Sequence, residues 1–161
     1  MSVAGEACAV TLHPGMICAE DSVSLVRTVL GSCVSVCLFD PLSRRGGINH
    51  YVLPLWNGDG LPSPRYGNIA IAKLIEKMEA MGSRRERLVA KIFGGGAVLG
   101  PGPGLLNVGQ RNITIAEDLL GEARIPIIAR DVGGTCSRKL IFVTESGEVR
   151  VRRLGNGRPM R

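Results

Sequence analysis

Two cysteines and a histidine in the first third of the chain are the residues best suited to covalent chemistry. Cys33 and Cys37 lie in the stretch TVLGSCVSVCLFD, and His50 follows Cys33 by seventeen residues. A nucleophilic cysteine needs exposure, a base that accepts its proton and donors for the developing oxyanion. Cys33 directly follows Gly31 and Ser32, a flexible pair that can present a thiol at a strand end. These residues alone leave two interpretations open: a catalytic pair, or a packed Cys33 and a surface His50.

The chain has five cysteines, an odd number, and none of their spacings forms a Cys-x-x-Cys pair. A disulfide framework would be unusual in a domain of this size without a secretory signal. A structural zinc site would need a second ligand pair, and the chain has only two histidines. We therefore expect no metal and no cofactor. We expect most of the cysteines, including Cys37, to be small core residues.

The length and composition predict one soluble domain that spans residues 1–161. The chain is 45% hydrophobic and 21% charged, which is typical of a globular protein with its own core. No apolar run approaches the roughly 18 residues that a membrane span needs, so we expect no membrane insertion. The N-terminus lacks the basic region of a secretory signal, which favours a cytoplasmic location.

The net charge of +6 is concentrated in short basic segments, among them residues 82–87 and a basic tail from about residue 155. Nucleic-acid binding is one interpretation of this charge, but only 4% of the chain is aromatic and no nucleic-acid motif is present. We therefore expect no nucleic-acid partner and favour a solvated basic surface. A basic surface that meets an acidic protein partner is the third interpretation.

Alternating apolar residues predict the strands that would position Cys33 and His50. Short strands are expected at 7–12 and 23–30, with the turn HPGM between them. The segment VSVCLFD alternates between an apolar face of valines and leucine and a second face that carries Cys37. DPLSRRGG is predicted to turn the chain, and INHYVLPL to pair back as the next strand. This hairpin would return His50 alongside the strand that follows Cys33.

The remaining pattern predicts two helices and further strands. The periodicity of NIAIAKLIEKMEAM indicates a helix from Asn68 to Met81, with Asn68 as its N-cap and Gly82 at its end. A strand then runs into the glycine cluster FGGG, where the phosphate-loop lysine is absent and tight turns are expected. A second helix is expected from about Asn112, followed by a strand in PIIARDVGG and a hairpin that turns at residues 145–147. This order indicates an α+β (mixed α/β) fold with a mixed sheet and two helices.

The order of several motifs resembles one known family. TVLGSCVSVCLFDP and GGINHYVLP are followed by RYGNIAIAKLIEKMEAMG, LVAKIFGGGAVL, NVGQRN, ARDVGGTCSRKLIF and ESGEVRV. Together these motifs resemble the chemoreceptor glutamine deamidase family, CheD, over roughly Pro14 to Leu154. No single motif is specific, but their combination in this order is.

The resemblance implies hydrolytic deamidation of selected glutamine side chains in methyl-accepting chemotaxis receptors. It also implies a sandwich-like core of mixed sheets flanked by two main helices, similar to the catalytic domain of cytotoxic necrotizing factor toxins. By motif, the family's nucleophile falls on Cys33 and its base on His50. The family's threonine falls on Thr28, which precedes VLGSC and would orient His50.

The resemblance further implies a substrate groove around the catalytic residues. Its expected members are Gly31, Ser32, Gly94, Gly95, Arg111 and Asn112, with the backbone N–H groups of Ser32 and Cys33 as oxyanion donors. The receptors would be the protein substrates, and the phosphatase CheC is a further partner that family members bind. An alternative stays open: an adaptor that docks on receptors or on CheC with little catalysis.

Overall fold

The structure is a computed structural model that describes residues 8–98 and 107–155. The predicted basic tail beyond residue 155 lies outside the described residues. In chain order the elements are β1 (Ala9–Thr11), β2 (Ile17–Cys18), β3 (Leu25–Leu30), β4 (Val34–Asp40), β5 (Arg45–Asn49), α1 (Gly67–Ala80), the short 3₁₀ helix η1 (Arg85–Arg87), β6 (Val89–Gly94), α2 (Val108–Glu122), β7 (Ile127–Val132), β8 (Ser137–Val143) and β9 (Val149–Leu154).

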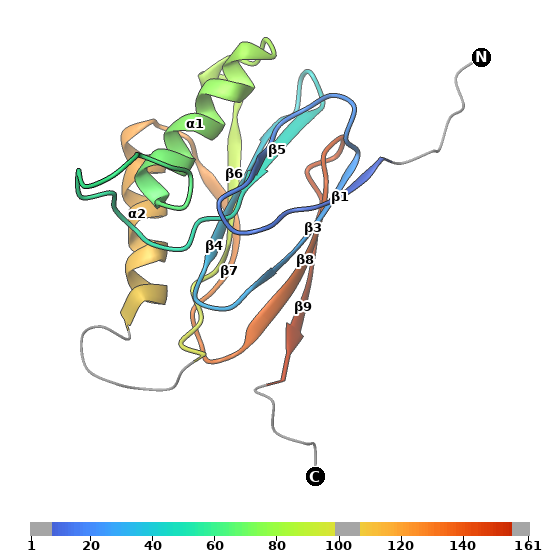
Figure 1. Ribbon diagram of the computed structural model, residues 1–161. Coiled ribbons are helices and arrows are strands. Elements are labelled where there is room, and N and C mark those ends of the chain that lie inside the picture. The colour runs from blue at the N-terminus through green and yellow to red at the C-terminus, as the bar shows by residue number, and fades with distance from the viewer. Residues whose placement is uncertain (1–7, 99–106, 156–161) are drawn as a thin grey trace.

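Two mixed sheets pack against each other, and both helices lie on the far side of one of them (Figure 1). The four-stranded sheet has the order β1-β3-β8-β9, and the five-stranded sheet has the order β2-β5-β4-β6-β7. The strands pair antiparallel except for β1 with β3 and β6 with β7. The predicted α+β fold, with a sandwich-like core and two main helices, is confirmed. The similarity to the cytotoxic necrotizing factor domain stays a prediction.

The alternation in β4 separates two layers of core. Val34, Val36 and Leu38 are buried in the cluster that the sheet forms with the helices. Cys37 is buried in the second cluster, between the two sheets, and Cys33 packs at its margin. The predicted two faces of this strand are therefore confirmed, and Cys37 is a small core residue as expected.

The strand that follows β4 lies earlier in the chain than predicted. Strand β5 covers Arg45–Asn49 rather than residues 48–55, and it ends just before His50. The physical reason is packing at Gly46 and Gly47, which were expected to belong to a surface turn. A Cβ at Gly46 would lie 2.7 Å from the Thr144 carbonyl oxygen, and one at Gly47 would lie 2.9 Å from a methyl group of Leu74. Only glycine allows the chain to enter the core at these two positions.

Both helix starts differ from the prediction. Helix α1 begins at Gly67 after Tyr66, and the Asn68 side chain accepts a hydrogen bond from the Trp56 N–H instead of capping the helix. Helix α2 begins at Val108, so Asn112 lies inside it and caps nothing. The Asn112 side chain is buried and donates to the backbone carbonyls of Ser32 and Val52 in two loops. These hydrogen bonds compete with the local preference of asparagine for a capping position. The expected end of α1 at Gly82 agrees with its positive φ of 103°.

The first and last strands of the described chain, β1 and β9, both belong to the four-stranded sheet. The predicted strands at 7–12 and 23–30 are present as the shorter β1 and β3, and they pair in parallel. Strand β2 between them was not predicted, and it joins the other sheet beside β5. The predicted hairpin is confirmed, with β8 and β9 on either side of residues 145–147. In the described part of the chain, no helix combines the length and apolar character that crossing a membrane requires.

Candidate active site

Cys33 lies where the chain crosses from one sheet to the other. It follows the end of β3 and directly precedes β4, with Gly31 and Ser32 in the turn. All three carbonyl oxygens of this turn are hydrogen-bonded from behind. Those of Gly31 and Cys33 accept from the N–H groups of Gly96 and Gly95, at 2.9 and 2.8 Å. The Ser32 oxygen accepts from the Asn112 side-chain amide at 3.0 Å. The turn that carries the thiol is therefore held in one conformation.

Among the hydrogen bonds of the described residues, the backbone N–H groups of Ser32 and Cys33 donate to no other residue. Because the carbonyls of the same turn accept hydrogen bonds from the neighbouring segments, these two donors are left for another group. Donors of this kind beside a thiol are suited to an oxyanion.

The glycine cluster packs against the back of this turn. Gly94 has φ +105°, and a Cβ there would lie 2.2 Å from the Cys33 carbonyl oxygen. A Cβ at Gly95 would lie 2.5 Å from the Ile113 side chain. The two glycines thus permit close backbone approach to the turn that carries Cys33, rather than contact with a bound molecule. Neither lines the pocket that holds Cys33.

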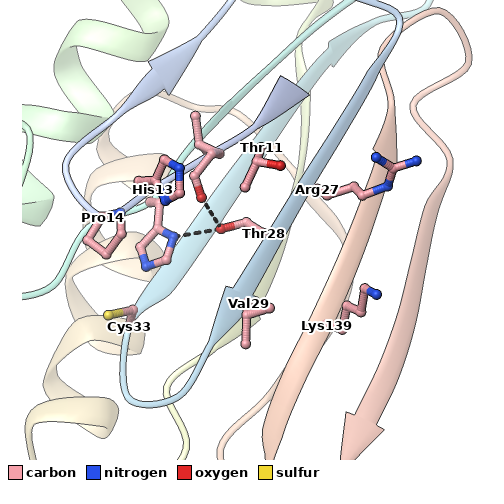
Figure 2. Close-up of a pocket in the computed structure, with 10 residues that line it drawn as sticks. Thr11, His13, Pro14, Arg27, Thr28, Val29, Cys33 and Lys139 are labelled. Carbon is pink, nitrogen blue, oxygen red and sulfur yellow. Dashed lines mark hydrogen bonds between the residues drawn. The ribbon is translucent and has the colours of Figure 1, made fainter. Parts of the chain in front are cut away.

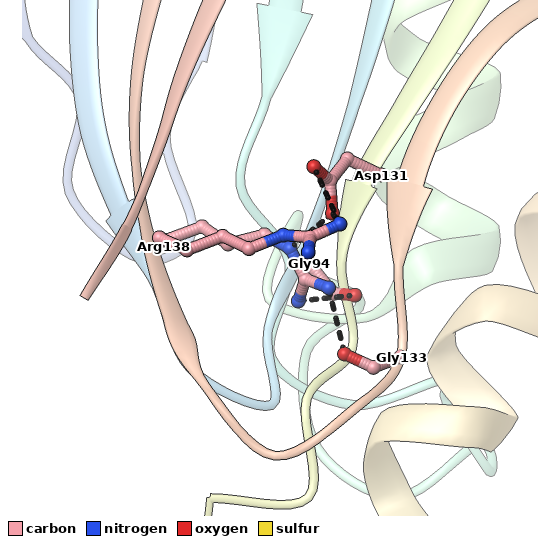
Figure 3. Close-up of polar contacts among 5 residues, drawn as sticks. Gly94, Asp131, Gly133 and Arg138 are labelled. Atoms are coloured by element: carbon pink, nitrogen blue, oxygen red, sulfur yellow. Dashed lines mark hydrogen bonds and ion pairs between the residues drawn. The ribbon is translucent and has the colours of Figure 1, made fainter. Parts of the chain in front are cut away.

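A buried arginine ties the glycine cluster to the neighbouring strands (Figure 3). The Arg138 side chain is 2% exposed, and its Nε donates to a carboxylate oxygen of Asp131 at 2.9 Å. Its Nη atoms donate to the carbonyl oxygens of Gly94 and Gly133, at 3.3 and 2.7 Å. Partial burial by itself would raise the pKa of Asp131, but the hydrogen bonds and positive charges of Arg138 and Arg153 hold it below its usual range. Arg138 was not singled out from the sequence, because no local pattern in SRKL distinguishes it from its neighbour Lys139.

Asn112 connects the turn that carries Cys33 to the segment that follows His50. Its side chain is fully buried, and the amide Nδ2 donates to the carbonyls of Ser32 and Val52, at 3.0 and 2.9 Å. The Tyr51 hydroxyl also donates to the Asn112 carbonyl oxygen. Asn112 therefore supports the site from behind and does not form the rim of a groove.

Thr28 and His50 meet although Thr28 lies on a strand of the four-stranded sheet and His50 directly follows a strand of the five-stranded sheet. The Thr28 hydroxyl donates to the Leu12 carbonyl oxygen at 2.8 Å. The hydroxyl oxygen of Thr28, Oγ1, lies 2.7 Å from His50 Nδ1. A hydroxyl has one proton, so its contact with His50 must be one in which Nδ1–H donates and Thr28 Oγ1 accepts. The neutral imidazole then has its lone pair on Nε2. This Nε2 is buried and has no partner among the described residues.

A pocket of about 510 Å³ contains these side chains (Figure 2). Cys33, His50 and Thr28 all line it, so the structure brings together the three residues that the resemblance selected. Arg27 and Lys139 line the same pocket and were not singled out from the sequence. The alternation of buried and exposed residues along β3 and β8 could have identified them, because it places both on the exposed face of the sheet.

Burial acts in opposite directions on the two titratable groups of the pocket. It raises the pKa of the Cys33 thiol above its ordinary value, with the positive charge of Arg65 as a smaller opposing effect. Burial lowers the pKa of His50 to about 4, assisted by the nearby His13. Both effects favour the uncharged forms. At neutral pH the resting site therefore holds a thiol and a neutral imidazole.

Arg111 lies apart from this site. It is exposed on α2 and lines a second, smaller pocket of about 210 Å³ between α2 and the loop at Pro54. In contrast, Gly31 and Ser32 belong to the turn that holds Cys33. In the described residues no group of three or more histidine, cysteine, aspartate or glutamate side chains is arranged to hold a metal ion.

The fold and the pocket define an α+β protein in which a cysteine, a histidine and a threonine converge between two sheets. The family model described as CheD chemotactic sensory transduction matches residues 53–153. The chain is 51% identical to a probable chemoreceptor glutamine deamidase CheD of Sulfurimonas denitrificans, with 86% of this chain and 89% of the relative covered. It is 46% identical to a protein of the same name from Trichlorobacter lovleyi, with 86% of each chain covered. A third relative, probable chemoreceptor glutamine deamidase CheD 1 of Anaeromyxobacter dehalogenans, is 48% identical over 90% of this chain and 84% of its own. The chain belongs to the CheD family.

Proposed function

We propose that the protein hydrolyses the side-chain amide of selected glutamines in chemotaxis receptors, with Cys33 as nucleophile. Three similar proteins carry the name chemoreceptor glutamine deamidase, which supports the reaction and its substrates. The observation that carries the mechanism is the hydrogen bond between Thr28 Oγ1 and His50 Nδ1 in the pocket that Cys33 also lines. This bond leaves Nε2 of His50 as the atom that can accept a proton.

The first half of the reaction forms a thioester. His50 Nε2 takes the Cys33 proton as Sγ attacks the glutamine Cδ, because neither group is charged beforehand. The backbone N–H groups of Ser32 and Cys33 donate to the oxyanion that develops on the amide oxygen. The carbon–nitrogen bond then breaks, and the leaving nitrogen takes the proton from Nε2 and departs as ammonia.

The second half returns the free enzyme. A water molecule attacks the thioester carbon while His50 Nε2 takes one of its protons. The carbon–sulfur bond breaks, and the proton on Nε2 returns to Cys33. The product side chain is a glutamate, so each turnover converts one neutral amide into a carboxylate and releases ammonia. The chain's own residues supply every proton transfer, and no step needs a metal or cofactor.

The location and the partners extend the proposal. All five cysteines are free in the structure, which supports action in a reducing compartment such as the cytoplasm. CheC is proposed as a second partner, bound independently of the thiol chemistry. A pull-down of CheC by the Cys33→Ala variant tests this point, since loss of binding would tie CheC recognition to the nucleophile itself.

The experiment that tests the proposed function combines receptor cytoplasmic fragments with peptide mass spectrometry for the conversion of glutamine to glutamate. Cys33→Ala is expected to reduce the rate by at least about 10³-fold, since it removes the nucleophile. Cys136→Ala, which changes a cysteine outside the pocket, is the matched control and should retain the wild-type rate. Equal conversion by wild type and Cys33→Ala, or conversion by neither, would favour the adaptor alternative.

A further inference from the structure

The outer face of the four-stranded sheet is not covered by either helix (Figure 1). The exposed residues of this face include four positive side chains. The alternation along β3, β8 and β9 sends one set of residues inward and the other set outward. The outward set includes Arg27, Lys139, Arg150 and Arg152, which are all exposed and which we call the basic face.

The register of the strands places these cations next to one another. Lys139 is directly opposite Arg152 on β9 and directly opposite Val29 on β3. Arg27 and Arg150 both pair with Ile141, one from each side. Like charges directly opposite each other on neighbouring strands destabilise a sheet, so folding stability gives no reason for this arrangement.

Acidic neighbours do not neutralise the basic face. Arg150 forms an exposed ion pair with Glu148 at 3.3 Å. Within residues 8–98 and 107–155, neither Arg27, Lys139 nor Arg152 has an ion-pair partner. The face therefore retains its positive potential toward solvent.

The basic face adjoins the pocket of the proposed reaction. Arg27 and Lys139 line that pocket together with Cys33, and no aspartate or glutamate lines it (Figure 2). Val29, which lies between them on the sheet surface, is 55% exposed and lines the pocket too. Arg65 is also near enough for its charge to act on Cys33. The charged side chains that line the pocket or act on its thiol are therefore cations.

We propose that the basic face binds acidic side chains that flank the target glutamine, and that it thereby selects the substrate segment. This inference rests on the proposed function, because it assigns the specificity of the same site. An acidic protein segment fits better than a nucleic acid or a membrane surface, because two of the four cations line the pocket that, under the proposed function, must receive a protein side chain. The same receptor segment that inserts its glutamine into the pocket can then place its acidic side chains against the cations around the pocket.

The test uses a receptor fragment that the wild-type protein deamidates, and a second version in which the acidic residues flanking the target glutamine are changed to serine. The measured quantity is the ratio of kcat/KM for the acidic version to kcat/KM for the serine version. For wild type this ratio should be about 5- to 10-fold, carried by KM and reduced by added salt, as expected for exposed charge pairs. The double variant Arg27→Gln with Lys139→Gln should bring the ratio close to one.

Two further variants sharpen the test. Lys73→Gln with Arg84→Gln removes the same number of charges from exposed positions away from the pocket, and should leave the ratio at its wild-type value. Arg27→Glu with Lys139→Glu should invert the preference, so that a fragment with lysines around the glutamine becomes the better substrate. Urea unfolding of each variant establishes that it is folded.

Each result bears on the proposal in one direction. A wild-type ratio near one, or an unchanged ratio in the double variant, overturns the basic face as a specificity surface while the proposed function stands. Absence of deamidation by wild type overturns both. A double variant that loses binding to phosphatidylserine-containing vesicles but keeps the wild-type ratio would identify the face as a membrane-contact surface, which also overturns the proposal.

Discussion

The Thr28 hydroxyl decides which nitrogen of His50 is free to accept a proton. Its own proton is committed to the Leu12 carbonyl oxygen, so it can only accept from His50 Nδ1–H. A single hydroxyl thus selects the tautomer and also orients the ring. The same logic applies wherever a second group determines which imidazole nitrogen carries the proton.

Thr28→Val should lower kcat by roughly 10–100-fold, as is typical when the partner that orients a functional histidine is lost. Valine has the same shape but leaves the Leu12 carbonyl and the His50 N–H unpaired. Thr28→Ser keeps the hydroxyl and should retain most of the activity. Steady-state deamidation of a receptor fragment measures both variants, and equal losses in both would argue that packing of the threonine methyl, rather than the hydrogen bond, is what matters.

The charge state of Cys33 predicts its reactivity toward iodoacetamide. Burial raises the pKa of the thiol and lowers that of His50, so the resting pair is uncharged at neutral pH. The alkylation rate should therefore climb steadily as the pH is raised from 6 to 9, because only the thiolate reacts. Peptide mass spectrometry follows Cys33 separately from the other cysteines. A rate that is already constant near pH 6 would instead indicate a preformed thiolate–imidazolium pair.

At the scale of elements, the site depends on strand ends that are held together by one buried guanidinium. Arg138 on β8 binds Asp131 on β7 and the carbonyl of Gly94 at the end of β6. Gly95, the next residue, donates to the Cys33 carbonyl. The two sheets are therefore linked next to the turn that carries Cys33, and the positive φ of Gly94 is part of that link.

Arg138→Met should lower the free energy of unfolding by about 3 kcal/mol, because it removes the buried donor of the Gly133 carbonyl and leaves the Asp131 carboxylate with only the exposed Arg153 as its ion-pair partner. Arg153→Gln is the matched control, since Arg153 binds the same carboxylate of Asp131 from an exposed position, at 3.1 Å. Its loss should cost less than about 1 kcal/mol. Urea unfolding measures the free energy for both variants. Similar losses would contradict the expectation that the buried Arg138 stabilises the protein more than the exposed Arg153 does.

For the whole molecule, the sandwich itself assembles the pocket. Thr28 comes from the four-stranded sheet, His50 follows a strand of the five-stranded sheet, and Cys33 lies on the connection between them. The cluster of apolar side chains between the sheets, which includes Val26, Leu30 and Phe93, holds the three parts in register. Partial opening of the sandwich would separate His50 from its hydrogen-bond partner Thr28.

The buried His50 also makes the stability of the molecule depend on pH. Its pKa is about 4 when folded, against 6.5 as its ordinary value. Between these two values the unfolded chain binds a proton that the folded protein excludes, so stability falls as the pH drops from 6.5 to 4. The expected loss is up to roughly 3 kcal/mol. In His50→Gln this contribution is absent.

Urea unfolding of both proteins at pH 7 and pH 4.5 measures the effect as a difference. Acid also protonates Asp40 and Asp131, whose pKa values are lowered in the folded protein, but that loss is common to both proteins. Wild type should therefore lose more stability than His50→Gln on acidification. A difference between the two proteins that stays the same at both pH values would contradict a buried neutral imidazole.

Local patterns in the sequence determined much of the fold. The two faces of β4, the hairpin of β8 and β9, and the helical face of α1 follow from periods of two and 3.6 residues, which neighbouring residues set by themselves. The position of Cys33 after Gly31 and Ser32 also follows from the chain alone. The order of motifs, through the resemblance to the CheD family, indicated His50 and Thr28 as the partners of Cys33.

The tertiary structure decided what depends on contacts between distant residues. Thr28 and His50 are 22 residues apart, one on a strand of the four-stranded sheet and the other just after a strand of the five-stranded sheet, so no local pattern encodes their hydrogen bond. Gly46 and Gly47 were expected in a turn because their local preference favours one, but close packing in the core places them in a strand. The second helix was expected to begin at about Asn112, but this residue lies inside the helix and its side chain donates to two distant carbonyls. Local sequence sets the period of an element, whereas packing between elements sets its register and its partners.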